Sequence, residues 1–155
     1  MYTADQMARR DASRWTIVQA VLAPIQFLAF IISAVLVARA LATGVGYDLA
    51  NTSIVLKIGL LWAITITGMI WEHEVYGQWF LAREFFWEDI GNLVAIITHN
   101  LYFVARWLGW DDQSTMGLMV FAYTTYLFNC AQFIRRGIMA GRQKRALRAL
   151  QQQTS

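Results

Sequence analysis

Four ionisable residues near the middle of the chain have the chemical types that acid–base catalysis uses: Glu72, Glu88, Asp89 and His99. Carboxyl and imidazole groups are the side chains that most often transfer protons in active sites. All four lie within or beside long apolar runs, and an apolar setting raises the pKa of a carboxyl group. We therefore expect a carboxylic acid that stays protonated near neutral pH and acts as a general acid.

Long apolar runs identify the elements that must position these residues. Hydrophobic residues make up 57% of the 155 residues and charged residues only 15%, a balance typical of membrane proteins. A membrane-spanning helix needs about 20 mainly apolar residues. Four segments meet or nearly meet this length, at about 15–38, 50–71, 90–110 and 113–134. The sequence predicts an all-α fold in which residues 1–134 form an integral membrane four-helix bundle.

The connections between these spans are short, so neighbouring spans are expected to run antiparallel, with both termini on one side. Ten of the thirteen Lys and Arg residues lie on that side, at positions 9, 10, 14, 83, 135, 136, 142, 144, 145 and 148. The positive-inside rule then predicts cytoplasmic termini in a multi-pass protein of the inner (cytoplasmic or intracytoplasmic) membrane. Lys57, in the second span, is expected to extend to the outer headgroups. Residues 135–155 are interpreted as a basic cytoplasmic tail that suits an anionic membrane surface, and no nucleic-acid partner is expected.

Polar residues inside the predicted spans recur at helical spacing. Glu88, Asn92 and His99 lie 4 and 7 residues apart, which at about 100° per residue puts them within roughly 40° on one face. Similar polar seams contain Gln19 and Gln26, then Lys57, Thr65 and Glu72, and then Asn129, Gln132 and Arg136. We expect the seams to line a polar slot open to the cytoplasm, with His99 at its bottom; interhelical hydrogen bonds alone are the alternative. Asp89 lies about 100° from Glu88, so a role limited to the start of its helix is the alternative to a catalytic role for this residue.

Two metal-based sites compete with this interpretation. A bis-histidine haem needs two histidines at one depth, whereas His73 lies at the predicted interface and His99 roughly 15 Å deeper, so we reject it. A carboxylate-bridged di-metal site has enough carboxylates and histidines near the inner loop, but the Glu-x-x-His motif of bundle di-iron proteins is missing from the sequence. No resident metal is expected.

Five stretches of the sequence, in order, resemble the 3-vinyl (bacterio)chlorophyllide hydratases of bacteriochlorophyll biosynthesis, also named 2-vinyl bacteriochlorophyllide hydratases. They are RRDASRWTIVQAVLAPIQFLAF from Arg9, LATGVGY from Leu41, TGMIWEHEVYGQWF from Thr67, FFWEDIGNLVAIITHNLY from Phe85 and YTTYLFNCAQF from Tyr123. Each stretch alone is weakly specific, whereas the series is specific and covers about four-fifths of the chain without the basic tail. His73 and Glu74 depart from the family pattern and are given no role.

The resemblance implies that water adds to the 3-vinyl group of a chlorophyllide or bacteriochlorophyllide and gives a 3-(1-hydroxyethyl) group without a redox step. Such a site needs an acid, a base for the water and a flat apolar slot. The acid is expected to be Glu72 or Glu88, and the group that orients or deprotonates water His99 or Asp89. An axial bond from His99 to the magnesium of the substrate is the other interpretation. The expected substrate-binding residues are Gln19, Gln26, Asn92, Asn129, Gln132 and Arg136.

The same resemblance implies the partners. No cofactor is expected, because the substrate carries its own magnesium. The propionate of the substrate would favour Arg83, Arg135 or Arg136 at the inner rim. Contact with other pigment-biosynthesis enzymes is expected as well. The rival function is a non-catalytic tetrapyrrole-binding or assembly protein that holds pigment in the same slot.

Overall fold

The computed structural model describes residues 2–153, which fold into helices joined by short connections. The helices are α1 (Ala4–Ala12), α2 (Arg14–Thr43), α3 (Tyr47–Tyr76), α4 (Phe86–Trp107) and α5 (Asp112–Gln153). This confirms the all-α prediction. The first, second and fourth predicted spans lie inside α2, α3 and α5, and the third lies in α4 except for residues 108–110.

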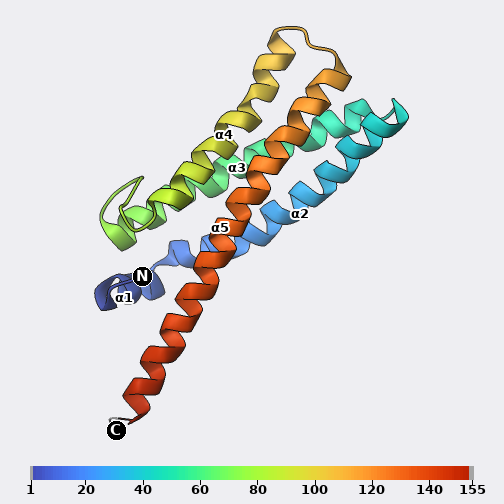
Figure 1. Cartoon of the computed structure of the whole chain (residues 1–155). Coiled ribbons are helices and arrows are strands. Elements are labelled where there is room, and N and C mark those ends of the chain that lie inside the picture. Colours follow the sequence, from blue (N-terminus) through green and yellow to red (C-terminus); the bar gives the residue numbers. More distant parts are fainter. Residues whose placement is uncertain (1, 154–155) are drawn as a thin grey trace.

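The four long helices pack as two pairs, α2 with α3 and α4 with α5 (Figure 1). In each pair a short connection reverses the chain. Gly44, in the left-handed conformation with φ 70°, ends α2 and donates its N–H to the carbonyl of Ala40 at 2.9 Å. This arrangement is favourable because glycine enters the left-handed region without the steric cost of a Cβ atom. Further contacts between α2 and α5 and between α3 and α4 join the two pairs.

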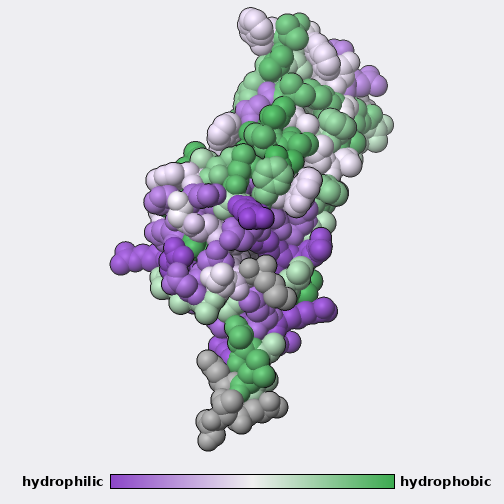
Figure 2. Space-filling model, turned by 60° about the vertical axis from the view of Figure 1, so that its left-hand side comes forward, coloured by the Kyte–Doolittle hydropathy of each residue, from purple (hydrophilic) through white to green (hydrophobic). Residues whose placement is uncertain are grey.

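Two of the helices, α2 and α3, are long and apolar enough to cross a membrane. The other two long helices fall short of that test, although both carry large exposed hydrophobic side chains, such as Ile97 and Phe103 on α4 and Phe121 and Phe128 on α5. Figure 2 shows hydrophobic residues over the upper part of the molecule and hydrophilic residues gathered below them. These surfaces indicate association with a membrane.

The helices enclose two apolar clusters. One surrounds Phe30, Ile54, Leu61 and Met119, between α2, α3 and α5. The other consists of Trp71, Val75, Ala82 and Phe85, where α3 ends and the α3–α4 connection folds back. The indole N–H of Trp71 donates to Thr16 Oγ1 at 2.9 Å, which ties this end of α3 to the start of α2. We call this end of the molecule the α1 end.

The α5 helix continues without a break through the predicted basic tail to Gln153. The sequence pattern did not predict the short helix α1. This helix begins with a capping box formed by Thr3 and Gln6. The N-terminal segment is fastened to α5, because Gln143 Nε2 donates to the Tyr2 carbonyl at 2.7 Å and Lys144 forms an ion pair with Asp11. The first part of the tail therefore has partners within the molecule.

Candidate active site

A cavity of about 590 Å³ lies among α2, α3, the start of α4 and α5, near the α1 end. We call it the central cavity. Ligand pockets in proteins usually measure about 300–1,000 Å³ and are mostly apolar with a few polar groups. Apolar side chains such as Phe27, Leu61 and Phe133 form much of its wall. Seven of the ten expected site residues also line it: Gln19, Gln26, Glu72, Asp89, Asn92, Asn129 and Arg136.

Two carboxyl groups stand together in the wall of this cavity. Glu72 and Asp89 are 2% and 5% exposed, and their carboxyl groups are close enough for each to affect the pKa of the other. Burial, and after it the neighbouring Glu72 carboxyl, raises the pKa of Asp89 to about 7. Two carboxylates this close do not both ionise readily, so the pair holds a shared proton near neutral pH.

The α3–α4 connection fixes this pair through its backbone. Leu81 N donates to Asp89 Oδ2 at 2.8 Å, and Ala82 N donates to Glu72 Oε1 at 2.6 Å. Leu81 has a positive φ of 58°. Among the described residues 2–153, it is the only residue other than glycine with a positive φ. A left-handed leucine costs roughly 1–2 kcal/mol. That conformation turns two consecutive N–H groups toward the two carboxyls, as in an anion-binding nest.

Four side-chain amides line the central cavity. Two of them have hydrogen-bond partners in the protein, and the other two have atoms without a partner. Gln19 donates to Thr67 Oγ1 at 2.7 Å, and Asn92 exchanges hydrogen bonds with Thr65 at 3.1 and 3.3 Å. Gln26 is 2% exposed, yet neither of its amide atoms has a partner, and Asn129 Oδ1 has none either. An unsatisfied buried polar group costs about 1–3 kcal/mol. These open atoms therefore mark positions where a water molecule or a polar ligand atom would be held.

Gly91 allows α5 to approach α4 closely beside the central cavity. A Cβ atom at this position would lie 1.9 Å from Gln132 Oε1 and 3.1 Å from Asn129 Oδ1. Only glycine fits this contact without displacing the two amides. The same approach lets Gln132 Nε2 donate to the carbonyl of Trp87 at 2.9 Å.

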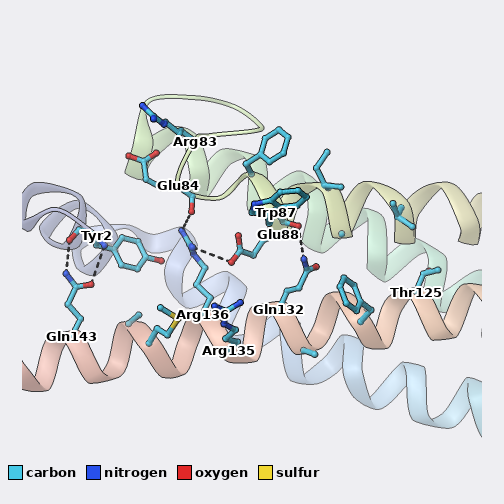
Figure 3. Close-up of a pocket in the computed structure, with 18 of the residues that line it drawn as sticks. Tyr2, Arg83, Glu84, Trp87, Glu88, Thr125, Gln132, Arg135, Arg136 and Gln143 are labelled. Carbon is cyan, nitrogen blue, oxygen red and sulfur yellow. Dashed lines mark hydrogen bonds and ion pairs between the residues drawn. The ribbon is translucent and has the colours of Figure 1, made fainter.

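A second cavity, of about 980 Å³, lies between α4 and α5 (Figure 3). We call it the lateral cavity. It contains two of the expected site residues that do not line the central cavity, Glu88 and Gln132. Arg136 borders both cavities. Its guanidinium lies 3.3 Å from Glu88 Oε1, donates to the Tyr76 hydroxyl at 3.3 Å, and donates to the carbonyl of Glu84.

The expected common slot for Glu88, Asn92 and His99 is wrong, because the structure separates the three. Glu88 faces the lateral cavity, whereas Asn92 and its neighbour Asp89 line the central one. Helix α4 packs between α3 and α5. Consecutive positions on a helix differ by about 100°, which lets Glu88 face Arg136 of α5 while Asp89 faces Glu72 of α3. Asp89, for which both a catalytic role and a role limited to the helix start were expected, is the residue that meets Glu72.

His99 lies beyond the central cavity, fully buried beside Lys57. Its Nδ1 is 2.7 Å from the carbonyl oxygen of Ala95, which only accepts, so Nδ1 carries the ring proton. Its Nε2 is 2.7 Å from Lys57 Nζ and accepts from it. Both ring nitrogens are thus engaged, and His99 lines neither cavity. This geometry favours neither proton transfer to a substrate nor an axial bond to magnesium.

Lys57 contradicts the expectation that its side chain extends to the headgroups. It is 0% exposed, and its Nζ lies 3.9 Å from the centre of the Tyr126 ring and 5.3 Å from that of Tyr123. The aromatic faces and the His99 nitrogen stabilise the amine in place of water. A long side chain near the end of a span can turn either way, and here the aromatic residues of α5 decide the direction.

Sequence reasoning missed the two backbone donors of the connection, Leu81 and Ala82, and the role of Gly91. Backbone N–H groups leave no signal in side-chain chemistry, so the carboxyl-binding turn was not predictable from residue types. Gly91 did carry a signal, since a small residue within a helix of a membrane protein often marks a close helix contact. Within residues 2–153, no group of three or more His, Cys, Asp and Glu side chains is placed to hold a metal ion.

Comparison with known proteins covers nearly the whole chain. The sequence model of the 2-vinyl bacteriochlorophyllide hydratase family matches residues 2–139. A protein of Rhodobacter capsulatus with the name 2-vinyl bacteriochlorophyllide hydratase is 48% identical over 134 residues, which are 86% of this chain and 78% of the relative. One of Cereibacter sphaeroides with the same name is 48% identical over 140 residues, 90% of this chain and 88% of the relative. No solved structure matches the chain.

Proposed function

The chain belongs to the 2-vinyl bacteriochlorophyllide hydratase family, and we propose that it hydrates the vinyl group of its pigment in the central cavity, through the Glu72–Asp89 pair. It is a hydro-lyase of bacteriochlorophyll biosynthesis. The observation that carries the assignment of the site is the pair of buried carboxyls in the cavity wall, which accept hydrogen bonds from two consecutive backbone N–H groups. The substrate in this proposal is a 3-vinyl chlorophyllide or bacteriochlorophyllide.

The proposed reaction is a proton transfer followed by addition of water. The Asp89 carboxyl gives its proton to the terminal vinyl carbon, and the electron pair of the double bond forms the new C–H bond. The carbon attached to the ring becomes cationic, and the conjugated macrocycle delocalises this charge. A water oxygen then bonds to that carbon and loses a proton to the Glu72 carboxylate. The product is the 3-(1-hydroxyethyl) pigment.

The shared proton of the pair suits this sequence of steps. Asp89 begins protonated, because its pKa is raised to about 7. After one turnover the proton has moved from Asp89 to Glu72, and transfer between the two neighbouring carboxyls restores the starting state. The proton balance therefore closes within the pair. Hydration changes no oxidation state, so we propose that the chain works without a cofactor of its own and that magnesium arrives as part of the pigment.

The amides of the cavity are proposed to bind the reactants. Gln26 and Asn129 have open amide atoms for the reacting water or for polar substituents of the pigment. Gln19 and Asn92 are held by Thr67 and Thr65 and keep the wall in shape. Glu88, paired with Arg136 in the other cavity, is not part of the proposed proton transfer.

We further propose that the four long helices form an integral membrane four-helix bundle of antiparallel spans with both termini cytoplasmic. The apolarity of α2 and α3 supports two spans, and the exposed hydrophobic residues of α4 and α5 support the others. Helix α4 has 22 residues, about 33 Å at about 1.5 Å per residue, close to the roughly 30 Å of the hydrocarbon layer. Residues 135–155 then lie on the cytoplasmic side of an inner membrane, where contact with other pigment enzymes is possible.

The test uses membranes that contain the protein, a 3-vinyl pigment and water labelled with oxygen-18. We expect one labelled oxygen in the hydroxyethyl product, measured by mass spectrometry. Retention of pigment in these membranes without any hydroxyethyl product would favour the rival function, a non-catalytic pigment carrier. Running the assay with chlorophyllide and bacteriochlorophyllide in parallel identifies the preferred ring.

A further inference from the structure

We propose that the lateral cavity between α4 and α5 recognises the carboxylate of an anionic, amphipathic pigment and is its entrance from the membrane to the central cavity. This inference rests on the proposed function and names the feature of the substrate that the protein selects. It assigns the pigment carboxylate to the arginines of one cavity and the vinyl chemistry to the other cavity.

The lateral cavity is apolar along one part and basic at the other. Val94 and Phe128 form an exposed apolar wall away from the α1 end. Arginines 83, 135 and 136 border the cavity toward the α1 end, and Figure 3 shows Arg136 reaching from α5 to Glu84 and Glu88. A flat apolar body with one acidic substituent matches this division of chemistry.

The charges of the cavity leave it open to an anion. Glu84 and Glu88 already have partners, since Glu84 Oε1 accepts from Gln6 at 3.0 Å and Glu88 Oε1 lies 3.3 Å from Arg136. Within the described part of the chain, Arg83 and Arg135 form no ion pair. Arg136 Nε is buried without any partner. A carboxylate would find two unpaired guanidinium groups and one free N–H, and guanidinium groups bind carboxylates in a fork geometry.

Arg136 also connects the two cavities. It is one of the few residues that line both, and its guanidinium lies 4.5 Å from the centre of the Phe85 ring, which belongs to the central cavity. A carboxylate that displaces Glu88 from Arg136 would loosen the side chain between the cavities at the moment when a pigment is present. The arrangement thus links recognition of the acid to passage of its apolar ring.

The test compares a free-acid 3-vinyl pigment with its methyl ester, which has the same ring without the charge. For the purified full-length protein, we expect kcat/KM to be about tenfold or more higher for the acid, the range of one charge-assisted hydrogen bond. Arg135→Gln should bring the ratio toward one by lowering the value for the acid and sparing that for the ester. Arg142→Gln removes the same charge from the exposed surface of α5 outside both cavities and should keep the ratio of the wild type.

A second variant tests the entrance itself. Ala131→Trp fills a position that lines only the lateral cavity, so we expect a lower kcat/KM with an unchanged kcat. Equal kcat/KM for acid and ester in the wild type, or an equal loss for both in Arg135→Gln, overturns the inference and leaves the hydratase proposal standing. If neither pigment is hydrated, the hydratase proposal fails. An absorbance titration with the acid and the ester then still decides the inference, because equal dissociation constants contradict it.

Discussion

Two buried ionisable pairs in this protein differ in what surrounds them. Glu72 and Asp89 border the central cavity and receive two backbone N–H groups from the α3–α4 connection. Lys57 and His99 lie deeper, closed in by aromatic rings and in contact with neither cavity. Both pairs come from the same two helices, α3 and α4. Access to a cavity, and not burial of an ionisable residue, therefore distinguishes the pair that is placed to do chemistry.

The two pairs also differ in how their hydrogen bonds are satisfied. In the Lys57–His99 pair the histidine proton goes to a carbonyl and the lysine donates to the remaining ring nitrogen, so each group stabilises the other. In the carboxyl pair, burial and the Glu72 carboxyl raise the pKa of Asp89, and the Asp89 proton is available to a bound molecule. The first arrangement stabilises packing, and the second is suited to proton transfer.

The largest effect that follows is on turnover. Glu72→Gln and Asp89→Asn keep the shape of each side chain but remove its proton transfer, which typically contributes 10²–10⁴-fold. We expect a loss of about that size in kcat with unchanged elution in size-exclusion chromatography. Asp48→Asn, at the opposite end of α3, is the matched control and should retain activity. More than half of the wild-type kcat in both variants would remove the pair from the mechanism.

The next effect is on stability and concerns the other pair. His99→Leu leaves the Lys57 amine buried without its hydrogen-bond partner, and an unsatisfied buried polar group costs about 1–3 kcal/mol, or more if it is charged. We expect a much lower melting temperature in detergent for this variant. The double variant Lys57→Met/His99→Leu replaces the pair with apolar groups and should recover most of the loss.

The double variant also separates structure from catalysis. If the Lys57–His99 pair acts only in packing, turnover per folded molecule stays within about threefold of the wild type, a difference below 1 kcal/mol. A folded double variant that has lost turnover would instead return His99 to the catalytic site, as its sequence position suggested.

The sequence could predict much of this arrangement but not which neighbour faces which cavity. Apolar length identified the helices, and helical spacing brought residues as distant as Gln19 and Asn129 to one cavity. The choice between Glu88 and Asp89 depends on how α4 crosses α3 and α5, because adjacent positions differ by about 100°. His99 points in nearly the same direction from α4 as Asn92, but the central cavity does not extend as far along the helix as His99. The relative direction of two side chains on one helix can be read from their spacing. Which cavity a side chain meets, and how deep that cavity is, depend on packing between helices.

The carboxyl pair predicts a pH dependence of turnover. The pKa of Asp89 is raised from 3.8 to about 7, so the acid form needed for the reaction is lost above about pH 7. We expect kcat/KM to fall about tenfold for each further pH unit. The residual rate of Asp89→Asn should lack this decline, and an identical decline in it would assign the titration to another group.

The same pKa shift affects folding stability. Because the folded state binds this proton more tightly, the contribution of Asp89 to stability is full below pH 3.8 and is lost as the pH rises through about 7.

The smallest effect concerns the close contact that shapes the wall near the carboxyl pair. In Gly91→Ala the new methyl group would meet Gln132 Oε1 at 1.9 Å, so the Gln132 side chain must move and its bond to the Trp87 carbonyl is lost. We expect a loss of about 0.5–1.5 kcal/mol from that hydrogen bond, seen as a lower melting temperature. Gly59→Ala, in α3 with open space around the added atom, should instead gain up to about 1 kcal/mol from helix propensity. Because Asn129 Oδ1 also lies 3.1 Å from the new atom, KM should rise in Gly91→Ala and not in Gly59→Ala. Equal melting temperatures and KM values for the two variants would mean that α5 can move away from α4 without loss of stability. The wall of the central cavity would then be less rigid than the surroundings of Lys57 and His99.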